Sequence, residues 1–217
     1  MNFYPLHRIF AGIRDAYVYA NINKAKDMFL KTMDWVCTWT SLVSSDEALQ
    51  RYLKCEHGGI LELLMDAYAL SNDNKYKNTA QRWIHSVGFA NELAGNRDIL
   101  RGKHANTQDS KFLGLAWYYE LTREQKTGAA ARNALNMIID KHTLPNGGHG
   151  FWERYGEPGK HTDHIGYTSS EHCCTYNTIK FTRNMINLDG QVKYMDLYEK
   201  QLYNHIMGAV DPTTTNS

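Results

Sequence analysis

The stretch "AYALSNDNKYKNTA" (residues 67–80) joins the apolar end of one expected helix to the start of a second through a short polar turn. Three other stretches share this pattern: "AYVYANINKAKDMF", "WYYELTREQKTGAA" and "TRNMINLDGQVKYM". Lysines in the turns mark the period, because Lys24, Lys75 and Lys126 follow one another at intervals of 51 residues, and Lys193 follows after 67. A repeated helical hairpin of this length predicts either a solenoid or a closed ring of inner and outer helices, an α/α toroid.

Apolar residues at helical spacing predict eight helices, and the alternating pattern of a strand is almost absent. The fold class is therefore expected to be all-α, with the helices paired into four hairpins. Four hairpins form only part of a six-hairpin ring, so a ring would be incomplete. The predicted helices are Leu6–Tyr19, Ala25–Val36, Ile60–Leu70, Tyr76–Val87, Phe112–Leu121, Ala129–Ile139, Tyr176–Ile186 and Tyr194–Met207.

The charge pattern excludes some classes of partner. The 217 residues carry 24 Lys and Arg against 23 Asp and Glu, without a basic run, which argues against a nucleic-acid partner. Residues 1–10 lack the apolar core of a secretory signal, and no apolar run is long enough to span a membrane. No membrane partner is expected, and the cellular compartment stays unknown. The four cysteines, two of them adjacent, are expected to be reduced.

An insertion, residues 143–170, precedes the fourth hairpin and is rich in Gly, Pro, His and acidic residues. Long loops in helical frameworks commonly carry function, so this segment is expected to be an active-site loop. Three polar segments, residues 54–59, 102–108 and 169–177, each come directly before the first helix of a hairpin. Because the repeat brings the starts of these helices to one rim of a ring, the three segments are expected to converge.

The last of these segments, "SSEHCCTYN", contains Glu171 and Cys173 two positions apart at a predicted helix start. A carboxylate and a thiolate are ligands for zinc, and the helix dipole favours the thiolate form of a cysteine at this position. Two ligands are half of a zinc site, so spacing alone leaves a second interpretation open. In that interpretation the cysteine is a small buried apolar residue and Glu171 is an acid of the first helical turn.

Inside the insertion, Glu153 lies beside Trp152. An apolar wall raises the pKa of a carboxyl group, which suits the general acid of glycoside hydrolysis; the alternative is a solvated loop glutamate. His57 and His104, from two of the helix-start segments, are candidates for hydrogen bonds to sugar hydroxyls, and they equally suit solvated or capping positions. Motifs of phosphoryl transfer and of serine hydrolases are absent.

Six segments, in this order along the chain, resemble the β-L-arabinofuranosidases of glycoside hydrolase family 127 and the related family 146: "FYPLHRIFAGIRDAY", "EHGGILELLMDAY", "GKHANTQDSKFLGLAWYYELT", "NGGHGFWERYG", "SSEHCCTYNTIKFTR" and "YEKQLYNHIMGAVDP". The resemblance covers essentially the whole chain. It implies an (α/α)6 barrel and retaining hydrolysis of arabinofuranosides in a plant-type oligosaccharide or glycan. It also implies a bacterial source. The nucleophile in the family is a cysteine bound to a zinc ion, and the ligands of this ion are one glutamate and three cysteines.

The resemblance assigns roles to individual residues. Glu171 and Cys173 match the Glu-x-Cys zinc motif, and Glu153 matches the general acid/base. His104 lies in a substrate-contacting motif, with His57 and Trp152 as further substrate-binding candidates. Cys174 is an additional thiol beside the ligand position and is a candidate third zinc ligand. In the family, the nucleophile and the remaining zinc cysteine come from a later Cys-Cys stretch. Both are therefore expected to be missing from this sequence. Residues 1–217 are expected to be an internal fragment of a larger enzyme, or the product of a short gene, with little turnover.

Residues 1–217 are therefore expected to form one partial (α/α)6 catalytic domain. Two rival functions belong to other classes: a non-catalytic carbohydrate-binding remnant and a helical-repeat interaction protein. An open toroid would expose apolar faces at its edge, including that of Tyr194–Met207, and such faces are expected to drive homo-oligomerisation.

Overall fold

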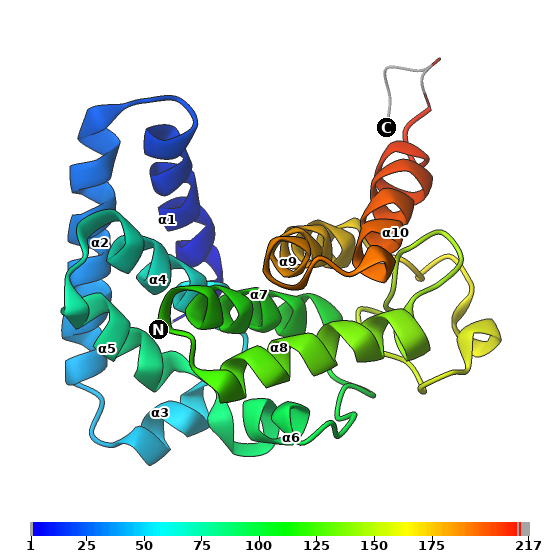
Figure 1. Ribbon diagram of the computed structural model, residues 1–217, viewed down its shortest axis with the longest axis horizontal. Helices are drawn as coiled ribbons and strands as arrows, with labels where there is room; N and C mark the ends of the chain where they lie inside the picture. Colours follow the sequence, from blue (N-terminus) through cyan, green and yellow to red (C-terminus); the bar gives the residue numbers. More distant parts are fainter. Residues whose placement is uncertain (1, 212, 214–217) are drawn as a thin grey trace.

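The computed structural model describes residues 2–211 and 213, and the regular structure in this range is helical (Figure 1). Four hairpins follow one another, and all eight predicted helices are confirmed. Helices α3 (Asp46–Tyr52) and α6 (Asn91–Ala94) are additional, because each is too short to show a helical period. The hairpin helices are α1 (Phe3–Val18), α2 (Asn23–Ser41), α4 (Ile60–Ser71), α5 (Asn74–Trp83), α7 (Ala105–Thr122), α8 (Gln125–Met137), α9 (His172–Asp189) and α10 (Val192–Lys200).

Four short segments complete the helical structure. A 3-10 turn, η3 (His161–His164), lies within the insertion, and π-helical turns extend or connect the longer helices. The π-helical segments are η2 (Ile138–His142) and η4 (Gln201–Met207); η1 (Ser86–Ala90) is a kinked segment in which Val87 and Gly88 have non-helical backbone angles.

The four hairpin turns share one backbone conformation. Asn21, Asn72, Arg123 and Gly190 all have positive φ, at 56°, 56°, 59° and 61°. Each lies three positions before the turn lysine, so the backbone repeats with the same intervals as the sequence. In the last three turns the positive-φ residue donates its N–H to the carbonyl four residues earlier, which ends the first helix of the hairpin.

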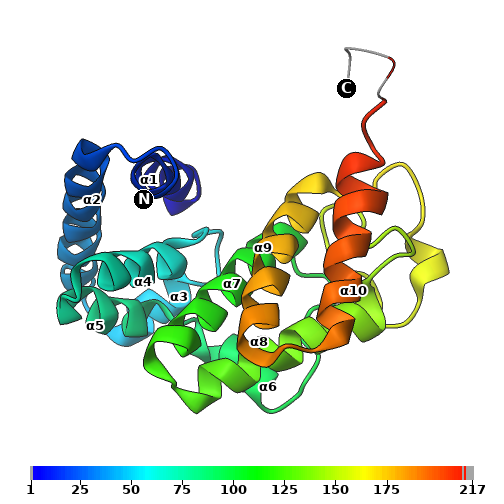
Figure 2. The ribbon, with the colours of Figure 1, turned by 45° about the horizontal axis from the view of Figure 1, so that its top comes forward.

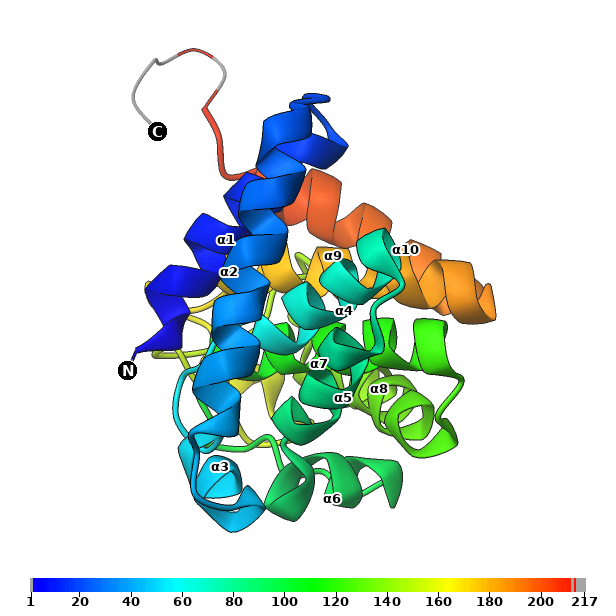
Figure 3. The same cartoon turned by 90° about the vertical axis from the view of Figure 1, so that its left-hand side faces the viewer.

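The hairpins stack in the order of the chain. The first helix of each hairpin packs on the first helix of the next, α1 on α4, α4 on α7 and α7 on α9 (Figures 2 and 3). Each second helix packs on its own first helix. This row of inner helices, each backed by its hairpin partner, is an incomplete α/α barrel.

Helix α7 occupies the centre of this array and is buried along almost its entire first half. Residues 106–111 are six consecutive polar residues, and all are buried. A polar stretch is stable in such a place only if its groups are hydrogen-bonded. The start of α7 is therefore the point to which the rest of the structure brings polar partners.

The last helical unit is apolar on two sides. Tyr194 and Leu197 are buried against the rest of the protein, whereas Met195, Tyr203 and Met207 are exposed. Homo-oligomerisation through this edge stays a prediction. None of the helices described is both long enough and apolar enough to cross a membrane.

Candidate functional site

The three helix-start segments meet, as the repeat predicted. The hydroxyl of Thr107, at the start of α7, donates to Glu56 Oε1 at 2.7 Å, in the segment before α4. From the start of α9, Asn177 Nδ2 donates to Asn106 Oδ1 at 2.5 Å. The starts of α4, α7 and α9 are thus joined by side-chain hydrogen bonds, and the 143–170 insertion lies against them.

The insertion contributes a two-residue hairpin turn. Phe151 and Arg154 exchange both backbone hydrogen bonds, at 2.8 and 3.0 Å, and the two residues between them have positive φ: 49° at Trp152 and 61° at Glu153. Positive φ at both central positions is the pattern of a type I′ turn, in which Asn and Gly are the favoured residues. A bulky residue in this region of φ costs about 1–2 kcal/mol, so the turn must be held by its surroundings.

Backbone hydrogen bonds hold this turn on both sides. Ala105 N donates to Glu153 O at 2.8 Å, which ties one arm to the start of α7. On the other arm Trp152 N donates to Thr168 O at 3.1 Å, and Ser170 N donates to Gly150 O at 3.0 Å. The turn is thereby clamped between the start of α7 and the segment that leads into α9.

The clamped turn presents Glu153 and Trp152 to solvent beside His104. The Glu153 side chain is 69% exposed and Trp152 is 67% exposed, so the apolar wall expected around this carboxyl group is not formed by the described residues. His104 Nε2 lies 3.8 Å from Glu153 Oε2, and His104 Nδ1 lies 2.9 Å from Glu56 Oε1. The imidazole ring therefore lies between two carboxylates, within reach of a molecule bound at the surface.

At the start of α9, the ligand atoms of Glu171, Cys173 and Cys174 all lie within 4.8 Å of one another. Cys173 is half-buried, and its sulfur lies 3.5 Å from Glu171 Oε2; Cys174 is fully buried. A carboxylate and two sulfurs are a donor set that suits zinc. The two adjacent cysteines thus approach the same point.

The two thiols differ in acidity. The interaction with the Cys174 side chain lowers the pKa of Cys173 below its usual value. The same contact, together with burial, raises the pKa of Cys174. Cys173 is therefore the sulfur that ionises first.

A second cluster, which the sequence did not predict, lies beneath Cys174. Asp109, His149 and Cys174 are all fully buried, with ligand atoms within 4.8 Å of one another. Asp109 accepts a hydrogen bond from the Tyr155 hydroxyl, and its other oxygen lies 2.9 Å from His149 Nε2. Burial and the Asp109 charge raise the pKa of Tyr155 well above its usual value, so this phenol stays protonated. In the sequence, Asp109 is marked only by its place in a run of six polar residues, 106–111.

His57, predicted as a substrate contact, lies below this surface. It is 2% exposed, its ring centroid lies 5.8 Å from that of Trp83, and Nδ1 lies 3.3 Å from the Cys55 carbonyl. Burial, followed by the charge of Lys111, lowers the pKa of His57 well below its usual value. His57 is therefore buried and neutral in this structure, and a contact between His57 and a substrate stays a prediction. The other predicted residues form two groups: His104, Trp152 and Glu153 at the surface, and Glu171, Cys173 and Cys174 at the start of α9.

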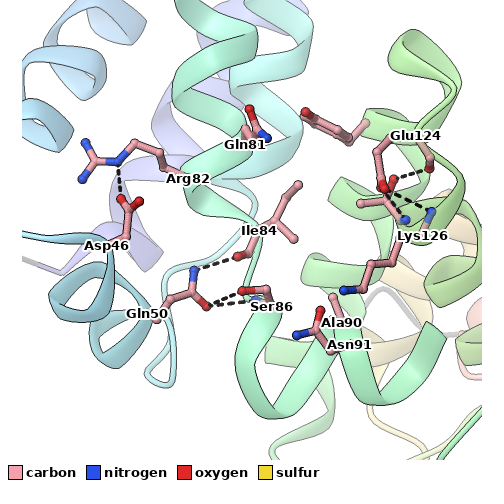
Figure 4. Close-up of a pocket in the computed structure, with 12 residues that line it drawn as sticks. Asp46, Gln50, Gln81, Arg82, Ile84, Ser86, Ala90, Asn91, Glu124 and Lys126 are labelled. Atoms are coloured by element: carbon pink, nitrogen blue, oxygen red, sulfur yellow. Dashed lines mark hydrogen bonds and ion pairs between the residues drawn. The ribbon is translucent and has the colours of Figure 1, made fainter. Parts of the chain in front are cut away.

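Two pockets are relevant to the location of the site, and only the smaller one lies at these helix starts. One, of about 450 Å³, is lined by Glu56, His104 and Arg154 and so adjoins the clamped turn. A larger pocket of about 540 Å³ lies between α3, α5 and the start of α8, where Arg82 pairs with Asp46 (Figure 4). The larger pocket shares no lining residue with the smaller one. Of the predicted site residues, His104 lines the smaller pocket, and Arg154, which also lines it, directly follows Glu153.

Comparisons of sequence identify the family. The family profile "Beta-L-arabinofuranosidase, GH127 catalytic domain" matches residues 1–217. Among curated protein sequences, none matches this chain.

Solved structures share the fold. A structure described as a glycoside hydrolase has a TM-score of 0.74 at 18% identity, over 93% of this chain and 37% of that one. The GH127 β-L-arabinofuranosidase Ara127N-Se of Geobacillus stearothermophilus T6 has a TM-score of 0.67 at 16% identity, over 90% of this chain and 34% of that one. A GH127 β-arabinofuranosidase has a TM-score of 0.58 at 20% identity, over 70% and 25% of the two chains. This chain thus spans about a third of the length of these structures, and identities this low show the fold alone.

Proposed function

The chain belongs to glycoside hydrolase family 127, and from this premise we propose that it takes part in the retaining hydrolysis of β-L-arabinofuranosides in a plant-type glycan. Of the parts that such a reaction needs, we assign two to this chain: a zinc-holding group and a general acid/base. The observation that carries the proposal is the close approach of Glu171, Cys173 and Cys174 within 4.8 Å.

Glu171, Cys173 and Cys174 would hold the zinc ion. Their oxygen and two sulfurs are ligands that zinc prefers, and three donors leave one position of a tetrahedral site to a further ligand. When bound, zinc keeps coordinating sulfurs in the thiolate form. The lowered pKa of Cys173 supports this assignment, because its thiolate forms at the least cost.

Glu153 would act as the general acid/base. Its exposed carboxyl group would protonate the oxygen of the leaving group and then take a proton from the attacking water. The backbone geometry supports this role, because strained φ values at non-glycine residues cluster at functional sites. Trp152, in the same turn, offers an exposed indole ring to a sugar, and His104 offers a hydrogen-bonding nitrogen beside the acid.

The zinc site is tested by metal content. We expect near-stoichiometric zinc in the purified protein and loss of most of it in Glu171→Ala and Cys173→Ser, because each substitution removes a donor. Elemental analysis measures the zinc, and the absorption of the cobalt-substituted protein reports thiolate ligation. Cys37→Ser is the matched control, since Cys37 lies in α2, outside both clusters.

A further variant separates the two clusters that share Cys174. His149→Gln should keep its zinc if the ion is bound by Glu171 and Cys173. If zinc persists in Cys173→Ser but is lost in His149→Gln, the metal is bound instead by the buried cluster of Asp109, His149 and Cys174. Absence of zinc from the unaltered protein, even after incubation with the ion, would refute the zinc proposal.

The acid/base assignment is tested by hydrolysis of an alkyl β-L-arabinofuranoside, whose leaving group needs protonation, at high protein concentration and long incubation because little turnover is expected. Glu153→Gln should lower the rate by at least about a hundredfold while zinc content is unchanged. Glu157→Gln is the control, because Glu157 lies in the same loop but pairs with Arg101 at 2.7 Å. Equal losses in both variants, or none in either, would contradict the role of Glu153.

A further inference from the structure

The 450 Å³ pocket next to the clamped turn is lined by positive groups. Four cationic side chains line it, and Glu56 is its single carboxylate. Glu56 already contacts His104 and Thr107, at 2.9 and 2.7 Å. In a protein of net charge +1, this local excess of cations points to an anionic ligand. The four cations are Lys54, Lys103, Lys111 and Arg154.

Lys111 is the most informative of these side chains, because it is only 4% exposed. Its Nζ donates to the Leu53 carbonyl at 2.9 Å and lies 3.3 Å from His85 Nδ1. An ammonium group has three N–H donors, and these two contacts use two of them. Burial, with a smaller effect of the Lys103 charge, lowers the pKa of Lys111 to about 7. Its Nζ also lies 5.1 Å from the centroid of the Phe89 ring, and no carboxylate forms an ion pair with it among the described residues, so an anion in the pocket would supply a direct counter-charge.

His85, which also lines the pocket, has a donor without a partner. When Lys111 is protonated it can only donate, so His85 Nδ1 must accept and His85 Nε2 must carry the ring proton. That Nε2 is buried and has no hydrogen-bond partner in the structure. A buried donor without a partner costs free energy, and a ligand that accepts from it removes that cost.

We propose that this pocket binds the carboxylate of an acidic sugar residue in the glycan substrate. The proposal rests on the proposed function in one respect, that the ligand is part of a glycan. The pocket shares His104 with the candidate site, and Arg154 directly follows Glu153 in the clamped turn, so a sugar next to the cleaved bond would reach it. A planar guanidinium pairs well with a planar carboxylate, and the pocket volume suits one sugar ring.

The test is a binding titration of the full chain, followed by NMR or calorimetry, with D-galacturonate and with D-galactose, the matching neutral sugar. We expect galacturonate to bind at least about tenfold more tightly than galactose, because a hydrogen bond to a charged group is stronger than one to a neutral group. Lys103→Gln should remove most of this difference. Lys126→Gln, a matched substitution in the larger pocket, should leave the difference unchanged.

Three outcomes would overturn the proposal: equal affinity for the two sugars, binding of neither, or inorganic phosphate binding as tightly as galacturonate. The proposed function is tested independently of this pocket, by the zinc content of the protein and by the hydrolysis of a neutral arabinofuranoside. Galacturonate binding without zinc or hydrolysis would support the pocket and refute the proposed function. Zinc binding and hydrolysis without any preference for galacturonate would support the proposed function and refute the proposal for the pocket.

Discussion

Replacement of Asp109 by alanine is expected to lower the free energy of unfolding by about 3–5 kcal/mol. Asp109 is fully buried in α7, accepts a hydrogen bond from the Tyr155 hydroxyl and lies 2.9 Å from His149 Nε2. Alanine would leave both of these buried groups without their carboxylate partner in an interior that is closed to bulk water. Urea unfolding, with a chelator present so that metal binding does not contribute, measures the effect.

Asp34 offers a matched control for this substitution. It also accepts from a tyrosine hydroxyl, that of Tyr76 at 2.7 Å, and from a cation, Lys75 at 2.8 Å. Its side chain is 48% exposed, however, so water replaces the lost acceptor in Asp34→Ala and the expected loss is below about 1 kcal/mol. Similar losses in the two variants would show that the buried cluster contributes no more than a surface contact.

Replacement of Gly147 by alanine is expected to cost about 2–5 kcal/mol, from positive φ and from overlap with a neighbouring backbone. Gly147 has a φ of 90°, and a Cβ there would lie 2.8 Å from Gln201 N and from the carbonyl carbon of Lys200. Both atoms belong to the backbone where α10 continues into η4, so they cannot rotate away as a side chain would. The insertion would have to move off this helix, and the turn that carries Glu153 lies in the same loop.

Gly159 isolates the contribution of that contact. It lies in the same loop with a φ of 75°, but a Cβ there would meet nothing within 4 Å. Gly159→Ala should therefore cost only about 1–2 kcal/mol, from backbone strain alone. Thermal or urea unfolding of the two variants gives the difference, and equal losses would rule out the close contact between residue 147 and the 200–201 backbone.

Much of the fold was predictable because its signals are local. Helical periodicity acts within a few turns of chain, and the polar turn before each lysine contains the residue that takes positive φ. Asn21, Asn72 and Gly190 are residue types that accept this conformation; Arg123 is not, and only its place in the repeat indicated a turn. The helices α3 and α6 escaped prediction because seven and four residues hold too few turns for a period.

The site was predictable only where residue type and motif sufficed. Glu153, Glu171 and Cys173 stood out as chemically active residues at helix starts or in a long loop. Nothing local marks Trp152 and Glu153 as a positive-φ pair, because neither is a turn-forming residue and the conformation depends on hydrogen bonds to the segments on both sides.

By itself, the sequence determined the helices, their pairing into a repeated hairpin and the rim at which the polar segments meet, because these features follow from spacing along the chain. Only the tertiary structure decided which polar groups are buried together. Asp109 contacts His149 and Tyr155, which lie 40 and 46 residues away in the sequence. Lys111 donates a hydrogen bond to the Leu53 carbonyl, which is 58 residues away. Their burial is set by packing between hairpins, which no local pattern of residues records.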